Sequence, residues 1–418
     1  MSRYVTPAQA GVHDATMRSW IPAFAGMTWA MYPALCVTMK ILMLNYEFPP
    51  IGGGGGQAHL ALLRQYAGRG DLKVDVLTSA PKPGLTAERL SDNVTIHRVG
   101  IRKKDLHVWR RSEVIAWLIK AGSVYRGLIR QNKYDLVHAF FGFPTGWLCY
   151  RTAKRLPYII SLRGSDVPGA NARFKLDYRI LGPLVFKPIW QKASALVACS
   201  DGLKARAMEF LPSAEIEVIP NGVDLQRFHP AEVKQESGIL RLLTVGRLSV
   251  TKRLGLLIEA VELLGRQGCY VRLTVVGGGA MESELRQLLN QKDSRGVVTL
   301  LGRRDGREMP EIYRRHDILV SASMQEGMSN AMLEAMASGL PIVTTRCEGV
   351  DELIADNGII VDDPHPAPLA AAIEKLTRSP AVLRAMSCAA RKRAEGFSWR
   401  VTADRYVELY GKLAGGTA

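Results

Sequence analysis

No two cysteines in this 418-residue sequence have the spacing of a metal site. There is no CxxC pair and no neighbouring histidine-rich segment, and the six cysteines are widely separated: Cys36, Cys149, Cys199, Cys269, Cys347 and Cys388. Zinc sites are built from such clusters, so a zinc site is not expected. A chain of this length does not depend on disulfides. We therefore expect the thiols to be reduced and to pack in cores.

The sequence also lacks a long uninterrupted hydrophobic run. Residues 19–39 carry no charge, but prolines and a glycine interrupt them and no small-residue cleavage site follows. These features argue against a signal peptide and against a membrane anchor. Met39 is a second possible start, and residues 17–28 resemble translated repetitive bacterial DNA. We predict that residues 1–38 are a non-native or disordered extension.

Acidic residues are few, with 39 Asp and Glu against 55 Lys and Arg, and the net charge is +16. This balance predicts an anionic partner. Residues 39–228 hold 28 basic and 15 acidic side chains, whereas residues 229–418 hold 25 and 23. The densest basic segment, residues 98–133, has apolar residues at helical spacing from Val114 to Leu128. It predicts either a helix packed on its own sheet or a helix lying on an anionic membrane surface.

Composition and periodicity indicate the fold class. With 47% hydrophobic and 22% charged residues, disorder, collagen and a polytopic membrane protein are excluded. Apolar runs alternate with helical stretches and predict strands at residues 40–45, 72–78, 94–99, 135–139, 158–162, 195–199 and 215–219, then at 240–246, 270–276, 297–301, 317–321, 341–345 and 358–361. Runs apolar on both faces are typical of parallel strands. We predict an α/β fold of two Rossmann-like doubly wound domains facing a central cleft.

The most distinctive local pattern is QEGMSNAMLEAMASGLPIV at residues 325–343. Glu326 follows an expected strand, Ser329 is placed to cap the next helix, and Glu334 lies about one turn inside that helix. The two carboxylates can meet hydroxyl groups of one ligand. An anion can bind between them at three backbone amides, those of Met328, Ser329 and Asn330. Taken alone, the pattern also fits two solvated acids at a helix end.

Two cations mark a second strand end. Arg247 directly follows the expected strand at 240–246, and Lys252 precedes the next helix. Cations have the wrong sign for a helix N-terminus unless an anion binds there, so the pair suits a diphosphate. A glycine-rich turn, VVGGGAMES at 275–283, lies at a neighbouring strand end, where backbone can approach a ligand closely.

Polar groups also follow strands in the first half. The loop NYEFPPIGGGGGQAHLALL at residues 45–63 is neither a Walker loop nor a GxGxxG fingerprint, but its glycines permit close approach to a phosphate or sugar. His138 ends one expected strand, and Arg163 and Asp166 follow another. Such a histidine is more often structural than catalytic. Three strand ends with polar groups on one rim nevertheless favour a binding site on the acceptor side.

Taken in order, these segments resemble glycosyltransferase family 4, the retaining nucleotide-sugar transferases of the two-Rossmann GT-B fold. The resemblance covers residues 39 to about 415 and rests on FPP with its glycine loop, DLVHA, RGSD, PNGVD, GRL followed by a lysine, the GGG turn, EGMSNAMLE and SGLPIV. It implies an N-terminal acceptor-binding domain at 39–228 and a C-terminal donor-binding domain at 229–396. It also implies that a helix within 397–418 crosses back to the first domain.

The resemblance also implies roles for the residues that match the motifs. Arg247 and Lys252 would hold the donor diphosphate, and Glu334 would bind the ribose. Glu326 would hold the donor sugar, and His138 would lie beside it at the reacting centre. The remaining donor-binding residues are the glycines that would close over the phosphates, Gly53 and Gly54, and the amides of Met328, Ser329 and Asn330. Positions 328 and 329 depart from the usual aromatic residue and glycine, which leaves the donor sugar open.

The sequence therefore predicts a retaining transfer of a hexose from a UDP-sugar or GDP-mannose type donor to a hydroxyl of a glycan or lipid-linked acceptor, in bacterial cell-surface polysaccharide or glycolipid synthesis. No DxD-type metal cluster occurs and two cations can neutralise the diphosphate, so we expect no metal and no cofactor. A cytoplasmic enzyme, peripheral on the inner face of the membrane, is expected. The rival predictions are an epimerase or phosphorylase of the same fold and, less favoured, a non-catalytic basic membrane or nucleic-acid binding protein. No nucleic-acid reader motif accompanies the charge, so nucleic acid is not an expected partner.

Overall fold

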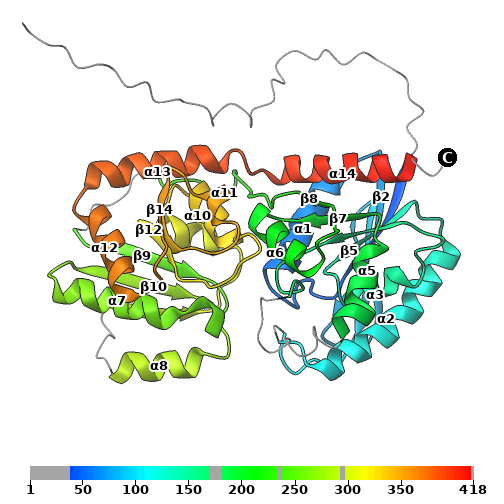
Figure 1. The fold of residues 1–418 in the computed structure, drawn as a ribbon, viewed down its shortest axis with the longest axis horizontal. Helices are drawn as coiled ribbons and strands as arrows, with labels where there is room; N and C mark the ends of the chain where they lie inside the picture. The colour runs from blue at the N-terminus through cyan, green and yellow to red at the C-terminus, as the bar shows by residue number, and fades with distance from the viewer. Residues whose placement is uncertain (1–37, 107, 169–180, 233–237, 292–296, 416–418) are drawn as a thin grey trace, which may run out of the picture. The chain divides into compact units, whose positions relative to one another are not determined.

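The computed structural model describes residues 38–106, 108–168, 181–232, 238–291 and 297–415. Apart from Thr38, the predicted N-terminal extension lies outside these residues. The described chain forms two α/β domains, each built on a largely parallel sheet (Figure 1). The predicted fold class is confirmed.

The first sheet has the strand order β3-β4-β2-β1-β5-β6-β7-β8. Its strands are β1 (Met39–Asn45), β2 (Leu72–Ala80), β3 (Gly84–Ser91), β4 (Val94–Gly100), β5 (Leu136–Phe140), β6 (Tyr158–Ser161), β7 (Ala195–Ala198) and β8 (Ile216–Val218). All pairs are parallel except that of β3 with β4, and β3 is the one strand of this sheet that was not predicted. Its residues are almost all exposed, so no apolar alternation marks it.

Helices cover both faces of the first sheet. They are α1 (Gly54–Tyr66), α2 (Arg111–Gln131), α3 (Thr145–Tyr150), α5 (Lys187–Gln191) and α6 (Asp201–Phe210), with a π-helical turn at Gly182–Phe186. Alternate residues of β1 enter different cores: Ile41 packs in the cluster of α1, and Leu42 in the cluster of α2. This double burial explains why β1 is apolar throughout.

Helix α2 lies within the basic segment 98–133, for which the sequence predicted either packing on its own sheet or contact with an anionic membrane surface. Trp117, Ala121 and Tyr125 are buried in the core, so these apolar residues pack on their own sheet. On the opposite side of the helix, Ile115 and Ile119 are 57% and 70% exposed. The helix therefore has a second apolar strip that the core does not use.

The second sheet is parallel throughout, with the order β11-β10-β9-β12-β13-β14. Its strands are β9 (Leu240–Val245), β10 (Val271–Val276), β11 (Val298–Gly302), β12 (Ile318–Ser321), β13 (Ile342–Thr345) and β14 (Gly358–Val361). Its helices are α7 (Leu254–Arg266), α8 (Glu282–Gln291), α9 (Met309–Arg314), α10 (Asn330–Ala337), α11 (Val350–Leu353), α12 (Pro366–Thr377) and α13 (Pro380–Ala394). A short 3₁₀ turn, Val250–Lys252, precedes α7.

The last helix, α14 (Trp399–Gly415), follows α13 in sequence but packs on the first sheet (Figure 1). Its Tyr406 and Tyr410 are buried in the same core cluster as Tyr66 of α1. The change of sheet falls between β8 and β9. The exact boundaries at residues 228 and 396 remain a prediction. Among the described residues, no helix has both the length and the apolar character needed to cross a membrane.

In each sheet the chain first adds strands on one side of its first strand and then on the other side. This topological switch point lies between β1 and β5 in the first sheet and between β9 and β12 in the second. Ligands of open α/β sheets bind beyond the carboxyl ends of the strands at such points. The loops that follow these four strands are therefore where a site is expected.

Candidate functional site

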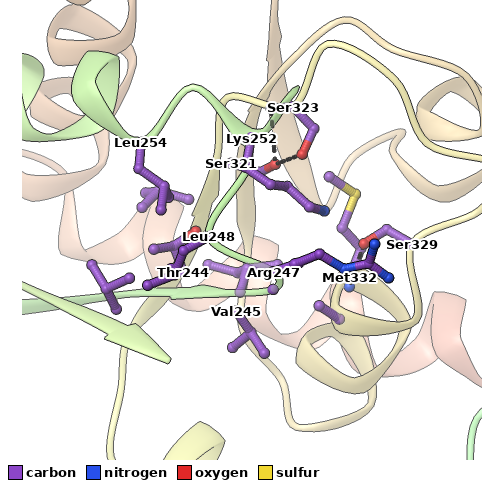
Figure 2. Close-up of a pocket in the computed structure, with 15 residues that line it drawn as sticks. Thr244, Val245, Arg247, Leu248, Lys252, Leu254, Ser321, Ser323, Ser329 and Met332 are labelled. Atoms are coloured by element: carbon purple, nitrogen blue, oxygen red, sulfur yellow. Dashed lines mark hydrogen bonds between the residues drawn. The ribbon is translucent and has the colours of Figure 1, made fainter. Parts of the chain in front are cut away.

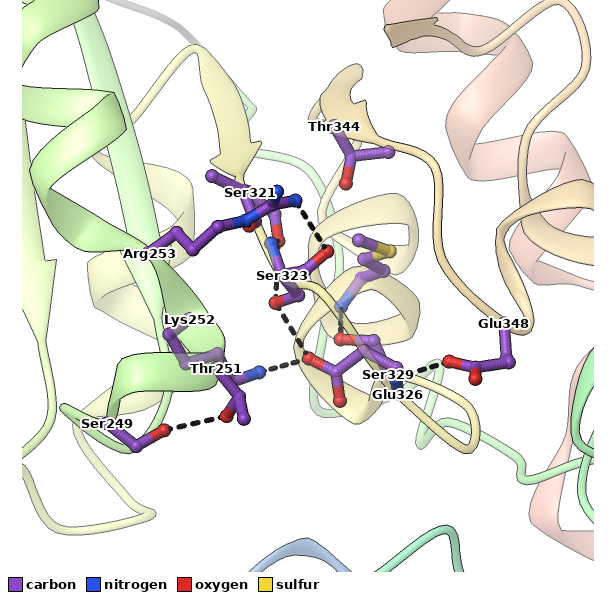
Figure 3. Close-up of polar contacts among 12 residues, drawn as sticks. Ser249, Thr251, Lys252, Arg253, Ser321, Ser323, Glu326, Ser329, Thr344 and Glu348 are labelled. Atoms are coloured by element: carbon purple, nitrogen blue, oxygen red, sulfur yellow. Dashed lines mark hydrogen bonds and ion pairs between the residues drawn. The ribbon is translucent and has the colours of Figure 1, made fainter. Parts of the chain in front are cut away.

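Lys252 and Glu326 meet at the reversal point of the second sheet. Lys252 ends the 3₁₀ turn after β9, Glu326 lies in the loop after β12, and their side chains form an ion pair. The Ser323 hydroxyl donates to the same Glu326 oxygen at 3.0 Å (Figure 3). The pair is about four-fifths buried, with 22% of the lysine and 17% of the glutamate side chain exposed. The predicted cation and the predicted carboxylate are therefore brought together.

Arg247 and Lys252 line the same pocket (Figure 2). Ser329 and Met332, at the start of α10, line it as well. Arg247 itself is exposed, because Gly246 with φ 157° and the following turn carry it out beyond the end of β9. Its guanidinium lies against Gly53 of the first domain: a Cβ at Gly53 would come within 2.7 Å of Nη2. A side chain at position 53 would thus displace the arginine. The predicted diphosphate cation and the predicted glycine loop face each other.

Helix α10 begins beside this pocket. Ser329 is its N-cap, and its hydroxyl accepts a hydrogen bond from the Met332 amide at 3.4 Å. Asn330, the first helical residue, donates from Nδ2 to the Gly54 carbonyl at 3.2 Å. Met328 is buried and accepts a hydrogen bond on sulfur from the Asn221 amide, so only its backbone remains for a ligand. These residues therefore sit at the site, although a role in binding the donor stays a prediction.

The loop that carries Glu326 is held from outside the pocket. The Glu326 amide donates to Oε2 of Glu348 at 3.0 Å, and the other oxygen of Glu348 accepts from Arg206 of α6 at 2.6 Å. The Ser200 hydroxyl also donates to the Gly327 carbonyl at 2.6 Å. Backbone atoms on both sides of the Glu326 side chain are therefore fixed by the first domain and by the loop after β13.

Glu334 occupies a neighbouring groove rather than the pocket of Arg247. The groove is lined by α1, by residues 222–228 and by the start of α14, and Asn330 belongs to it as well. The Tyr313 hydroxyl donates to Oε2 of Glu334 at 2.9 Å. Burial raises the pKa of Glu334 to about 7, against the smaller opposing effects of the Tyr313 hydrogen bond and of Arg227. A carboxyl group with a pKa near 7 is partly ionised at neutral pH, and its oxygens can accept hydrogen bonds from ligand hydroxyls.

His138 does not lie where the sequence prediction placed it. It is the middle residue of β5, not the last, and its ring is fully buried. Nδ1 is 2.6 Å from the Tyr410 hydroxyl and Nε2 is 2.7 Å from the Ser161 hydroxyl. Burial lowers the pKa of His138 well below its usual value, and nearby His59 and Arg163 add to the effect. Both ring nitrogens are engaged within the core, which favours a structural position, and the expected role of His138 at the reacting centre stays a prediction.

Asp166 is also structural in its contacts. Its two oxygens accept hydrogen bonds from the backbone amides of Gly142 and Arg163, each at 2.8 Å, and 8% of the residue is exposed. Arg163 is better placed for a ligand. Its Nη1 donates to Asn221 at 2.8 Å, and Asn221 in turn donates to Asn330, so Arg163 is linked to the start of α10. Of the two acceptor-side candidates, Arg163 is the one connected to the site.

Three residues at the site were missed by sequence reasoning. Glu348 and Asn221 lie outside the strand-end motifs that predict the site, although Asn221 belongs to the PNGVD segment of the family resemblance. Glu47 follows β1 and lies beneath the glycine loop, since a Cβ at Gly52 would meet its Cβ at 2.7 Å. Burial raises the pKa of Glu47, against the opposing charge of Arg247. The signal was present in NYEFPP, where an acid follows a buried strand.

In the part of the chain that the structure describes, the site included, no group of three or more His, Cys, Asp or Glu could hold a metal ion.

Two family models match most of the chain. The model for Glycosyltransferase Family 4 matches residues 53–227, and the model for Glycosyl transferases group 1 matches residues 240–379. Among curated relatives, the glycogen synthase of Mycobacterium tuberculosis is 27% identical over 395 residues, which cover 89% of this chain and 94% of that protein. The D-inositol 3-phosphate glycosyltransferase of Kineococcus radiotolerans is 27% identical over 424 residues, with the same two coverages.

Solved structures agree on the fold. Sucrose-phosphate synthase from Thermosynechococcus elongatus superposes with a TM-score of 0.79 at 20% identity, covering 91% of this chain and all of that one. Anabaena Alr3699/HepE in complex with UDP-glucose superposes with a TM-score of 0.68 at 18% identity, covering 90% and 100%. At these identities the likeness shows the fold alone, which is that of the GT-B glycosyltransferases.

Proposed function

The chain belongs to glycosyltransferase family 4, and from that premise we propose that it is a retaining transferase, which moves a hexose from a nucleotide diphosphate sugar to a hydroxyl of a glycan or lipid-linked acceptor. The observation that carries the proposal is the meeting of Arg247, Lys252 and Glu326 with the glycine loop at Gly53. Two cations and a carboxylate at strand ends suit a ligand that joins a diphosphate to a sugar.

Arg247 and Lys252 would neutralise the charge that develops on the diphosphate as the glycosidic bond breaks. The Arg247 guanidinium is exposed and lies against Gly53, so phosphate oxygens can reach it between the two domains. Lys252 is paired with Glu326 and would exchange part of that contact for a phosphate oxygen. Because these cations suffice for charge neutralisation, we propose that no divalent metal is required.

Glu326 would bind hydroxyls of the donor sugar and orient it. The acceptor hydroxyl attacks the anomeric carbon from the face that the diphosphate leaves, and its proton passes to a leaving-phosphate oxygen. The new bond then keeps the configuration of the old one. The engagement of Glu326 by Lys252 and Ser323 favours this orienting role over that of a nucleophile.

The neighbours favour a uridine donor. Anabaena Alr3699/HepE has been solved with UDP, with UDP and glucose, and with UDP-glucose. UDP-glucose is therefore the first donor to test, followed by GDP-mannose. Glu334 would bind the ribose from its adjoining groove, which is also lined by Asn330, the first residue of α10.

We also propose a membrane-borne acceptor, used in bacterial cell-surface polysaccharide or glycolipid synthesis at the inner face of the membrane. The exposed strip of α2 joins Ile115 and Ile119 to basic side chains on the same helix, among them Lys120, Arg126 and Arg130. Such a face can insert apolar groups among anionic headgroups while its cations remain at the surface.

A donor screen tests the proposal. Thermal shift with UDP-glucose, GDP-mannose and their free nucleotides should identify one nucleotide that stabilises the protein. Incubation of that donor with lipid extract should give a product whose anomeric configuration, read by NMR, equals that of the donor, and EDTA should leave the rate unchanged. An inverted product or full loss with EDTA would contradict the mechanism. Conversion of the donor without a glycosylated acceptor would favour an epimerase or phosphorylase.

Vesicle flotation tests the membrane surface. Binding to vesicles containing anionic phosphatidylglycerol should fall for Ile115→Asp/Ile119→Asp and at high salt. Leu85→Asp on β3, which changes another exposed aliphatic side chain of the same domain, is the matched control. Equal binding by all three proteins would contradict a docking role for α2.

A further inference from the structure

Arg253 has a backbone conformation that L-residues rarely adopt. Its φ and ψ are both 45°, in the left-handed region, and among the described residues only Phe141 is another non-glycine residue with positive φ. It lies between the 3₁₀ turn that ends at Lys252 and the first residue of α7. Glycine would adopt this conformation without a Cβ clash. The presence of arginine therefore calls for a contribution from its side chain.

The side chain of Arg253 joins two strand ends. Its Nε donates to the Ala322 carbonyl at 2.7 Å, and Nη2 donates to the Thr345 hydroxyl at 3.0 Å. Nη2 also lies 3.4 Å from the Ser323 carbonyl (Figure 3), which accepts from the Thr345 hydroxyl at 3.1 Å. Residues 322 and 323 begin the loop after β12, and Thr345 ends β13. One guanidinium thus holds together the starts of two loops at the carboxyl edge of the sheet.

The ion pair joins the 3₁₀ turn, which directly precedes Arg253, to the loop after β12, which Arg253 contacts. Lys252 immediately precedes Arg253, and Glu326 lies three residues after Ser323. A backbone hydrogen bond from Met324 to the Thr251 carbonyl, 2.8 Å long, runs between them. The left-handed turn lets adjacent side chains reach opposite ends of one loop: Arg253 reaches its first residues and Lys252 reaches Glu326.

We propose that Arg253 is a positioning residue that sets the distance between Lys252 and Glu326, and with it the spacing at which the site receives the diphosphate and the sugar of the donor. This inference rests on the donor-binding function proposed above. The other ties between the loop after β12 and the 3₁₀ turn include one backbone hydrogen bond and the ion pair, and neither engages the first residues of the loop, 322 and 323, as the guanidinium does.

Arg253→Gly tests the contribution of the side chain without changing the backbone conformation, since glycine keeps the left-handed turn without strain. Arg241→Gly is the matched control. Arg241 of β9 makes a bidentate contact, at 3.0 and 3.1 Å, with Asp317, which directly precedes β12. This contact also joins β9 to β12, but at their amino ends, whereas the site lies at their carboxyl ends. Its loss should cost stability without disturbing the site.

For Arg253→Gly we expect the donor KM and the UDP dissociation constant to rise about tenfold, while the acceptor KM stays unchanged. Millimolar guanidinium should restore part of the loss, and Arg253→Lys should restore less, because an ammonium lacks the planar fork. A donor KM and UDP affinity within twofold of wild type, or a change equal to that of Arg241→Gly, would overturn the inference.

A second measurement does not depend on the donor. Lys252 freed from Glu326 should react faster with an amine-specific acylating reagent, which peptide mass spectrometry reads in the unliganded protein. Faster labelling of Lys252 in Arg253→Gly than in wild type and Arg241→Gly supports the positioning role, and equal labelling overturns it. If wild type binds no nucleotide but the labelling difference is present, the proposed function fails and the positioning of Lys252 stands.

Discussion

The hydroxyl of Tyr410, in the last helix of the described chain, lies 2.6 Å from Nδ1 of His138, in the middle of the first sheet. Tyr410 also lies 3.2 Å from the Tyr66 hydroxyl, and Ser161 joins His138 to Tyr406. His138 is therefore one member of a buried polar network that attaches α14 to the first domain. This relationship favours a stabilising role for His138.

His138→Ala should lower the free energy of unfolding by about 2–4 kcal/mol, through a cavity and two lost hydrogen bonds. We expect kcat at a temperature well below the transition to change by less than about threefold, because the ring does not reach the site. Chemical denaturation and steady-state kinetics measure the two quantities, and Tyr410→Phe should show the same division in milder form. A hundredfold loss of kcat with unchanged stability would restore the catalytic interpretation.

Arg247→Ala should reduce kcat/KM by about 100- to 1,000-fold, because the departing diphosphate loses a preorganised cation. Stability should change little, since Arg247 is exposed. Initial rates with the identified donor measure the effect. Arg272→Ala, an exposed arginine on β10 of the same domain, is the control and should retain normal activity. Near-normal turnover of Arg247→Ala would refute the assignment.

Glu326→Gln should separate nucleotide binding from transfer. The amide cannot hold the Lys252 ammonium as an ion pair, so Lys252 becomes more available to phosphate. UDP affinity, measured by calorimetry, should therefore be equal or higher in the variant, whereas the transfer rate should fall by about 100-fold as the sugar loses its orienting carboxylate. Weaker UDP binding would show that Glu326 supports the diphosphate site instead.

Glu334 should make stability depend on pH. Its pKa is raised by burial from 4.5 to about 7, so between these values the folded chain keeps a proton that the unfolded chain has lost. Its stabilising contribution is complete below pH 4.5 and is lost as the pH rises through 7. Relative to Glu334→Gln, the unliganded wild type should lose on the order of 2 kcal/mol of stability between pH 4.5 and 8. Denaturation curves of both proteins at several pH values measure this difference, and parallel pH profiles would contradict it.

The strands of both sheets were predictable because their own residues carry the signal. Ile41 and Leu42 face different cores, and both must be apolar. Strand β3 carries no such signal, since Leu85 and its neighbours are exposed and pairing with β4 defines the strand. The N-cap at Ser329 was equally local, because the hydroxyl and the amide that it accepts from are three residues apart.

The candidate site was predictable only in part, because several contacts join residues far apart in sequence. The strand that carries His138 continues to Phe140, and one of the polar partners of His138, Tyr410, comes from α14, 272 residues later. Glu348 and Arg206 likewise meet across 142 positions. The residues adjacent to Glu348 or Arg206 in sequence do not indicate which distant residue is the partner. Their role in holding the Glu326 loop could therefore be found only from the structure.

The placement of α14 has a consequence for how the protein is made. The core under the first sheet joins Ile41 and Met43 of the first strand to Ala403, Tyr406 and Leu409 of the last helix. The ribosome adds these last residues only after the whole second domain, so the apolar surface beneath β1 stays uncovered while that domain is synthesised and folds. The first domain to be made is therefore completed only once α14 has been added.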